Sequence, residues 1–239
     1  MKSKLIDSNN IMIITGTRKG IGRDLALYYI ENGYKVIGCS RGKSSIIHYN
    51  YDHHELDITD EISVKSFFSE IRKKYGKVNV LINNAAVNNA LSPVTLVSFK
   101  SASSTINTNF LGTFIMSREA IKLMINNRFG RIINFGSMAV KHEEKGEAIY
   151  TASKAAIITF TKILSKEIYQ YGITCNIVSP SALKTDLMQN INSELLNIIL
   201  KRNAINELAS NEEIINVVNW LISLEANKIT GQNIYLGGV

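Results

Sequence analysis

The chain has 239 residues, 45% of them hydrophobic, and its 27 basic against 20 acidic side chains give a formal net charge of +7. This length predicts a single domain over residues 1–239 with its own core. Two cysteines cannot make a disulfide framework, and 2 prolines and 15 glycines exclude collagen-like or proline-rich chains. The first ten residues hold no signal-peptide run, and no stretch has the roughly 18 apolar residues of a membrane span, so we expect a cytoplasmic protein.

Short apolar runs alternate with segments of helical periodicity along the chain. The runs predict strands over residues 11–14, 36–39, 53–56, 78–82, 131–135, 173–178 and 233–236. The periodic segments predict helices over residues 20–30, 60–75, 98–127 (with a break), 149–171 and 211–224. This alternation predicts an α/β fold: a Rossmann-like, doubly wound parallel sheet of about seven strands with helices on both faces. The ligand is then expected at the carboxyl ends of the strands.

The pattern also makes predictions about the start of the second helix and the link between the second and third strands. Thr59 is the expected N-cap of the second helix, because a hydroxyl there accepts hydrogen bonds from the first free N–H groups. The link between Val36 and Asp57 is too short for a full crossover helix. Residues 42–49 are therefore expected to form one helical turn or an irregular loop.

A glycine-rich turn follows the first predicted strand. It reads Thr15-Gly16-Thr17-Arg18-Lys19-Gly20-Ile21-Gly22, with the spacing G-x-x-x-G-x-G. Glycine lets the backbone approach a diphosphate closely, and the helix that follows offers free N–H groups at its positive end. A purely structural turn has the same composition, but the position after the first strand favours dinucleotide binding.

The end of the second strand indicates which dinucleotide binds. An acidic residue at this place binds the 2′-hydroxyl of NAD, whereas a basic one suits the 2′-phosphate of NADP. Here Ser40 and Arg41 follow the strand, no acid is present, and Lys19 lies in the glycine-rich turn. A solvated Arg41 is the alternative; the pairing with Lys19 favours NADP(H).

Tyr150 and Lys154 lie four residues apart on a predicted helix, so their side chains share one face. An ammonium beside a phenol favours the phenolate, which makes the phenol a better acid and base. Ser137 follows the fifth predicted strand, where its hydroxyl could bind the oxygen of a substrate carbonyl while Tyr150 protonates it. The Y-x-x-x-K spacing alone is weak evidence for a catalytic pair. The position of this helix after the fifth predicted strand strengthens that evidence.

At this point the chain resembles the short-chain dehydrogenase/reductase family, over about residues 10–239. Its resemblance to NADP-dependent 3-oxoacyl-carrier-protein reductases is the strongest within that family. The matching pieces are Thr15 to Gly22, Asp57-Ile58-Thr59, Asn83-Asn84-Ala85, Asn109, Ser137, Tyr150 with Lys154, Pro180 with Thr185, and Ile229-Thr230-Gly231-Gln232. Many ordered matches are more specific than any single motif.

The resemblance implies a role for each matching residue. Tyr150 is the implied acid/base, Lys154 lowers its pKa and binds the nicotinamide ribose, Ser137 polarises the carbonyl, and Asn109 holds a water that links Lys154 to solvent. Asp57 and Ile58 are placed against the adenine, Asn84 and Ala85 against the adenosine and ribose, and residues 180–185 around the nicotinamide. The implied cofactor-binding residues are Gly16, Arg18, Lys19, Gly20, Ile21, Gly22, Ser40, Arg41, Asp57, Ile58, Asn84, Ala85, Tyr150, Lys154, Leu183 and Thr185.

Two residues depart from the family pattern. Ala86 and Ser181 stand where glycines are usual. Ala86 adds a methyl group where the backbone usually packs tightly. Serine tolerates a positive φ less well than glycine, so Ser181 predicts a shifted loop over the nicotinamide.

The substrate is a small molecule with a carbonyl or an alcohol, and two classes stay open. A 3-oxoacyl thioester on an acidic carrier protein requires basic docking residues: Arg128 and Arg131 precede the fifth strand, but Tyr171 stands where a second basic residue is expected. Residues 138–149 hold five charges and a histidine, which favours a polar substrate such as a sugar, unless these charges face solvent. Residues 190–206 are either a lid over the substrate or a packed helix.

Other functions have less support. No His or Cys spacing of a metal site is present, and His53 and His54 are expected at the surface end of a strand. No nucleic-acid motif accompanies the positive charge, and Arg18, Lys19, Arg23, Arg41 and Lys43 gather where a polyanionic cofactor would bind. A non-catalytic NADP-binding sensor is the alternative to an enzyme. The resemblance also implies a homotetramer or homodimer formed through the helices near residues 98–127 and 149–171.

Overall fold

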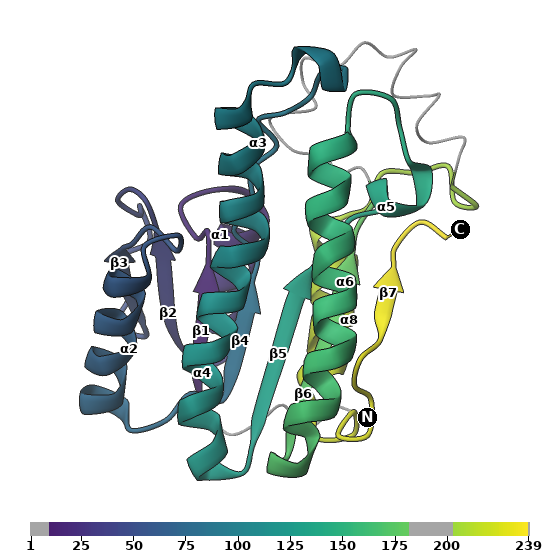
Figure 1. Cartoon of the computed structure of the whole chain (residues 1–239). Helices are drawn as coiled ribbons and strands as arrows, with labels where there is room; N and C mark the ends of the chain where they lie inside the picture. Colours follow the sequence, from purple (N-terminus) through teal and green to yellow (C-terminus); the bar gives the residue numbers. More distant parts are fainter. Residues whose placement is uncertain (1–9, 182–202, 239) are drawn as a thin grey trace.

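The structure is a computed structural model and describes residues 10–181 and 203–238. Seven parallel strands form one sheet in the order β3-β2-β1-β4-β5-β6-β7 (Figure 1). The strands are β1 Ile11–Thr15, β2 Lys35–Ser40, β3 Tyr51–Glu55, β4 Val80–Asn83, β5 Gly130–Phe135, β6 Ile173–Ser179 and β7 Asn233–Tyr235. The order reverses between β1 and β4, so the predicted doubly wound sheet is confirmed.

Helices cover both faces of this sheet (Figure 1). The helices α1 (Gly20–Glu31) and α8 (Asn211–Ile222) pack on one face. The helices α2 (Glu61–Tyr75), α4 (Thr113–Asn127) and α6 (Ala148–Ile168) pack on the other. Each face therefore has its own hydrophobic core.

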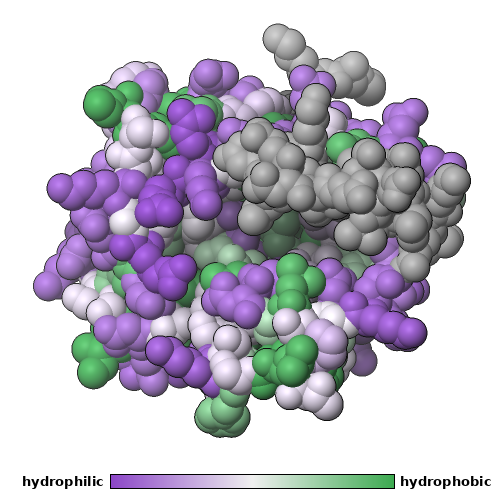
Figure 2. Space-filling model, turned by 90° about the horizontal axis from the view of Figure 1, so that it is seen from above, coloured by the Kyte–Doolittle hydropathy of each residue, from purple (hydrophilic) through white to green (hydrophobic). Residues whose placement is uncertain are grey.

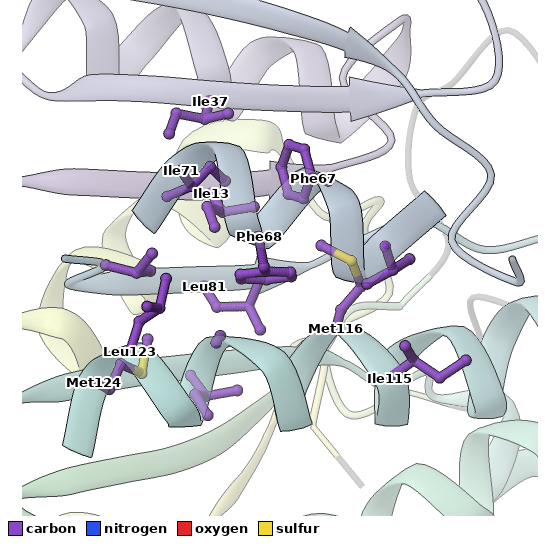
Figure 3. Packing of buried hydrophobic residues seen from close by; sticks show 14 of the residues in the cluster. Ile13, Ile37, Phe67, Phe68, Ile71, Leu81, Ile115, Met116, Leu123 and Met124 are labelled. Carbon is purple, nitrogen blue, oxygen red and sulfur yellow. The ribbon is translucent and has the colours of Figure 1, made fainter. Parts of the chain in front are cut away.

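Alternation within the strands divides the side chains between the two cores. Ile13 and Ile37 belong to the core under α2 and α4, where they lie close to Phe67, Phe68 and other apolar residues (Figure 3). Met12, Ile14 and Val36, on the opposite pleat, belong to the core under α1 and α8. Strands buried on both faces are mostly apolar, which is why they read as nearly continuous apolar runs in the sequence.

The long helical segment before β5 has the predicted break. It consists of α3 (Phe99–Ile106), a π-helical turn η2 (Asn107–Gly112) and α4. Ser98 caps the start, because its side chain accepts a hydrogen bond from the Ser101 N–H. A π-helical turn widens the backbone by one residue and is frequent at functional sites.

Two sequence predictions are corrected or decided here. The N-cap of α2 is Asp60 and not Thr59: the Asp60 carboxylate accepts from the N–H groups of Ile62 and Ser63, while the Thr59 hydroxyl donates to Asp57. Residues 41–50 hold no helix, so the crossover between β2 and β3 is an irregular loop. The short helices η1 (Val94–Leu96), α5 (Ala139–His142) and η3 (Tyr169–Tyr171) complete the described elements.

Arg131 also departs from its predicted place. It lies within β5, is 2% exposed, and donates to the backbone oxygens of Gly130 and Ser223. Burial lowers the pKa of this guanidinium to about 10. Arg131 is therefore part of the core and no surface docking residue.

Within residues 10–181 and 203–238, none of the helices combines the length and the apolar content that a bilayer crossing needs.

Candidate active site

A cavity of about 880 Å³ opens at the carboxyl edge of the sheet, beside the point where the strand order reverses. Figure 2 views the molecule from this side, with hydrophilic residues over much of the surface and a hollow near the middle. The predicted cofactor residues that line the cavity are Gly16, Arg18, Lys19, Gly20, Ile21, Ser40, Arg41, Asp57, Ile58, Asn84 and Ala85. Residues far apart in the sequence thus converge on one cleft.

The three glycines of the turn have different reasons for being glycine. Gly16 and Gly20 adopt positive φ values of 80° and 61°, which favour glycine. A Cβ on Gly20 would meet no atom within 4 Å, so the backbone there borders open space. A Cβ on Gly22 would lie 2.5 Å from the Gly16 oxygen, so Gly22 serves close packing within the turn and does not line the cavity.

The α1 N-terminus and its surroundings suit a phosphate group. No side chain caps the helix, and its first turn contains no acidic residue. Arg18, Lys19 and Arg41 line the cavity and are exposed, and they form no salt bridge with any acid of the described chain. Free helix N–H groups, an open glycine backbone and unpaired cations together fit the diphosphate and phosphate groups of a dinucleotide.

Backbone and side-chain bonds fix the rest of the cleft wall. The Thr15 hydroxyl accepts hydrogen bonds from the N–H groups of Asn84 and Ala85, at 3.0 and 2.9 Å, which ties the end of β4 to the end of β1. Asp57 accepts from the N–H and hydroxyl of Thr59. Ile58 is buried against the π-helical turn, where a Cβ on Gly112 would come within 2.7 Å of it.

Asp24 and Asn211 are among the cavity residues that the sequence prediction missed. Asn211, at the start of α8, donates to the Asp24 carboxylate at 2.6 Å, and both line the cavity. Burial raises the pKa of Asp24, and the positive charge of Arg23 opposes this rise. The position of Asp24 in the first turns of α1 could have indicated its place in the cavity. Asn211 lies 187 residues away, and no local pattern indicates its place there.

The structure brings Ser137, Tyr150 and Lys154 together. Ser137 follows β5, and Tyr150 and Lys154 share one face of α6. The Lys154 ammonium lies 5.8 Å from the centre of the Tyr150 ring and donates to the Phe135 backbone oxygen at 2.8 Å. Lys154 is 3% exposed, so its position is fixed by packing and by that bond.

Burial dominates the titration of this group. It raises the pKa of the Tyr150 phenol; the hydrogen bond with Ser137 acts the other way, and the Glu147 carboxylate adds to the rise. Burial lowers the pKa of Lys154 to about 8. Ser137 therefore stabilises the phenolate, and Lys154 loses its charge in a range close to neutral pH.

Asn109 lies in the π-helical turn and is fully buried. Its amide group accepts from the Val87 N–H at 2.8 Å and donates to the Val87 oxygen at 2.9 Å. It also donates to the Ser153 hydroxyl at 3.0 Å, and Ser153 donates to the Tyr150 backbone oxygen. Asn109 is thus joined through Ser153 to the helix turn that carries Tyr150 and Lys154.

The two departures from the family pattern have different outcomes. Ser181 is not among the residues with positive φ, which in the described chain are Arg128, Glu143 and glycines, so its backbone carries no such strain. Ala86 lines the cavity. Leu183, Thr185 and most of residues 190–206 lie outside the described residues.

A family model described as short chain dehydrogenase matches residues 10–196. This chain belongs to that family. The short-chain dehydrogenase is 35% identical over 232 residues to the 3-oxoacyl-(acyl-carrier-protein) reductase FabG of Buchnera aphidicola subsp. Schizaphis graminum, covering 95% of each chain. It is 33% identical over 234 residues to the FabG of Escherichia coli, covering 95% of this chain and 96% of that one.

A solved structure of similar shape is the ligand-free aldohexose dehydrogenase of Thermoplasma acidophilum. It superposes with a TM-score of 0.89 at 29% identity, over 99% of this chain and 95% of that one. The short-chain dehydrogenase is therefore an oxidoreductase that acts on CH–OH or C=O groups, and the predicted enzyme class is confirmed.

Proposed function

We propose that this short-chain dehydrogenase interconverts a ketone and a secondary alcohol with NADP(H), Tyr150 being the acid/base. The observations that carry the proposal are the assembly of Ser137, Tyr150 and Lys154 and a cleft whose helix N-terminus is compatible with a phosphate. Asn109 links the two, because it is bonded to Val87 of the cavity lining and to Ser153 of α6. A non-catalytic sensor has no need of this assembly, so the enzyme is preferred to that alternative.

Each residue has one task in this proposal. The nicotinamide, when bound, supplies or accepts the hydride. In the reducing direction Ser137 and Tyr150 hold the carbonyl oxygen, and Tyr150 donates its proton to that oxygen. The Lys154 ammonium stabilises the phenolate that results and binds the ribose of the cofactor. Asn109 fixes the α6 turn through Ser153. The resemblance to the family assigns Asn109 a further role, the binding of the water that returns the proton.

The preference for NADP(H) over NAD(H) rests on charge. Arg18, Lys19 and Arg41 line the cleft without an acidic partner in the described chain, and Arg41 directly follows β2. Asp57 also lines the cleft, but its carboxylate already accepts two hydrogen bonds from Thr59. The cations match a 2′-phosphate, and no carboxylate stands where a 2′-hydroxyl would be bound.

A 3-oxoacyl thioester is the first candidate substrate, because the reductases named above are similar over 95% of the chain. Half of a carrier-docking pair is available. Arg128 is exposed at the end of α4, while Tyr171 occupies the second position and Arg131 is buried. Docking would then rely on Arg128 and its neighbours.

A polar substrate such as an aldose is the second candidate. His142 and Glu147 are half-buried, and the charge of Glu147 acts on Tyr150. Burial raises the pKa of Glu147, and His142 opposes this rise. A carboxylate near the reacting phenol suits a substrate with several hydroxyl donors, and the structurally similar aldohexose dehydrogenase is in accord with that chemistry.

One experiment separates these substrates. Absorbance at 340 nm follows NADPH oxidation with acetoacetyl thioesters and with polar ketones, and NADP⁺ reduction with aldoses, using Tyr150→Phe as the blank. We expect turnover with one class and none with the blank. Tight NADPH binding without turnover of any substrate would favour the sensor, and equal turnover by Tyr150→Phe would remove Tyr150 from the chemistry.

The proposed homo-oligomer forms through α4 and α6. Leu111, Phe114 and Ile163 are exposed on these helices and the turn before α4, and Phe114 packs edge-on against Phe160. Exposed apolar residues on neighbouring helices favour self-association. Analytical ultracentrifugation of the wild type and of Ile163→Lys tests this: we expect a dimer or tetramer that the charge weakens, and a monomeric wild type would contradict it.

A further inference from the structure

A hydrogen-bonded network lies next to the part of the cleft that carries Arg18 and Arg41. The Tyr51 hydroxyl contacts the Thr17 hydroxyl at 2.8 Å and the His53 Nδ1 at 2.9 Å. On the other side of the ring, His53 Nε2 lies 2.9 Å from the Gly42 backbone oxygen and 3.3 Å from the Ser40 hydroxyl. The Ser40 hydroxyl itself donates to the Gly42 oxygen at 2.7 Å.

The network joins three separate segments: the glycine-rich turn through Thr17, the edge strand β3 through Tyr51 and His53, and the turn after β2 through Ser40 and Gly42. Thr17 is fully buried and Tyr51 nearly so. A carbonyl oxygen only accepts, so His53 Nε2 carries a hydrogen in both the neutral and the protonated ring. The hydrogen bond from His53 to the Gly42 oxygen, which tethers the turn after β2, is therefore kept in both forms of the ring.

The tethered turn carries Arg41, one of the cations of the cleft. Arg41 lies between Ser40 and Gly42, the two residues that His53 contacts. The Arg18 guanidinium lies 3.2 Å from the place where a Cβ on Gly42 would be, so Arg18 lies against the same turn. No helix supports residues 41–50, and β3 is the outermost strand of the sheet. Without His53, the turn would keep the bond from the Ser40 hydroxyl to the Gly42 oxygen but would lose its side-chain anchor to β3.

Gly38 leaves the space that the Tyr51 and Thr17 hydroxyls occupy. A Cβ at this position would lie 2.2 Å from the Tyr51 hydroxyl and 2.5 Å from the Thr17 hydroxyl. Its φ is not positive, so backbone conformation is not the reason for glycine here. The glycine makes room for the Tyr51–Thr17 contact inside a buried strand.

We propose that Tyr51 and His53 are positioning residues for cofactor selection, which hold Arg41 and Arg18 where the 2′-phosphate of NADP(H) binds. This inference rests on the proposed preference for NADP(H). A long arginine loses side-chain freedom when it binds a phosphate, and a fixed backbone lowers that cost. NAD(H), which lacks the phosphate, gains nothing from this arrangement.

Direct binding tests the inference without turnover. Nucleotide fluorescence is titrated with the wild type, Tyr51→Phe, His53→Phe and His53→Gln, for NADPH and for NADH in parallel. We expect Tyr51→Phe and His53→Phe to weaken NADPH binding about three- to tenfold while NADH binding stays within about twofold. We expect His53→Gln, which keeps a donor and an acceptor, to recover most of the loss. His54→Phe is the matched control, because His54 points to the Phe67 side of the sheet and does not enter the network.

The outcomes are distinguishable. A wild type that binds NADPH and NADH equally well contradicts the proposed cofactor preference. A wild type that prefers NADPH, together with variants that keep the same NADPH-to-NADH ratio, overturns the positioning role and leaves the preference intact. A general loss of fold would weaken the binding of both nucleotides alike and lower the melting temperature. In that case the comparison of His53→Gln with His53→Phe decides: recovery of NADPH binding in His53→Gln supports the positioning role, and an equal loss in both variants overturns it.

Discussion

The catalytic end of the site and its phosphate end are built in opposite ways. Among the described residues, the cavity lining includes the phosphate end (Arg18, Lys19 and Arg41) and none of the residues of the catalytic end (Asn109, Ser137, Tyr150, Ser153 and Lys154). At the catalytic end Asn109, Ser153 and Lys154 are buried and joined to the backbone by hydrogen bonds of 2.6–2.9 Å, and Asn109 also donates to the Ser153 hydroxyl at 3.0 Å. At the phosphate end Arg18, Lys19 and Arg41 are exposed and have no ion-pair partner in the described chain. The catalytic end therefore holds its atoms in fixed positions, whereas the phosphate end distributes positive charge over an exposed surface.

This difference follows from what each end has to do. Proton transfer depends on distances of a few tenths of an ångström, which buried hydrogen bonds hold. Attraction of a polyanion acts over a longer range and needs charge rather than fixed atoms, at the cost of sensitivity to salt. Variants at the catalytic end should therefore change rates, and variants at the phosphate end should change cofactor affinity.

The largest effect is expected at the catalytic end. Tyr150→Phe removes the proposed proton donor and keeps the ring, so we expect kcat to fall about 10²–10⁴-fold, the usual contribution of a general acid. The Kd for NADPH should stay within a few-fold, because the phosphate end is untouched. Stopped-flow turnover and fluorescence titration measure the two quantities. A loss confined to NADPH affinity, with kcat preserved, would reverse the comparison.

Arg41→Ala tests the phosphate end. A charged hydrogen bond contributes about 1.5–3 kcal/mol, and exposure reduces this, so we expect NADPH binding to weaken about tenfold or somewhat more. NADH binding should change little, and the difference should shrink in 0.5 M salt. Lys43→Ala is the control, because Lys43 is an exposed cation two residues away that does not line the cavity. Equal losses for NADPH and NADH would exclude Arg41 from phosphate recognition.

The pH dependence sharpens the comparison through Lys154. Burial lowers the pKa of Lys154 to about 8, so its ammonium is present below that pH and is lost as the pH rises through it. The pKa of Tyr150 is raised, so the phenol keeps its proton over this range. We expect kcat/KM for NADPH, which reports on the free enzyme, to fall about tenfold between pH 7 and 9.

Lys154→Arg is the control for this pH profile, since a guanidinium stays charged throughout the range. Its residual activity should show no decline between pH 7 and 9. A wild-type profile that stays level to pH 10 would mean that the charge of Lys154 does not limit the reaction.

Much of this arrangement could be predicted from the sequence, because strand order converts local patterns into a common edge. The glycine-rich turn follows β1, Arg41 follows β2, and Ser137 follows β5, and all these strands end at the same side of the sheet. Parallel pairing then brings the segments together without further information. The helix spacing of Tyr150 and Lys154 adds the remaining pair.

What the sequence could not predict depends on contacts between distant or competing residues. Thr59 and Asp60 are both good N-cap residue types, and the structure uses the Asp60 carboxylate as the acceptor while the Thr59 hydroxyl donates to Asp57. Arginine is usually exposed, but Arg131 is buried within β5 and donates to the Ser223 backbone oxygen, a partner 92 residues away. No sequence motif indicates the role of His53, because Ser40 and Gly42, which it contacts besides Tyr51 of its own strand, lie in β2 and in the loop after it.

The smallest expected effect tests whether the buried hydrogen bonds fix the catalytic end or merely stabilise α6. Ser153 and Ser165 are buried serines of the same helix, and each donates to the backbone oxygen three residues before it. Only Ser153 also accepts a bond from Asn109, so Ser153→Ala leaves a buried amide hydrogen without its partner. We expect Ser153→Ala to lower the free energy of unfolding by about 1 kcal/mol more than Ser165→Ala in urea titrations. It should also reduce kcat two- to threefold, whereas Ser165→Ala leaves kcat unchanged. Equal changes in both variants would mean that Asn109 contributes to the site without the help of Ser153.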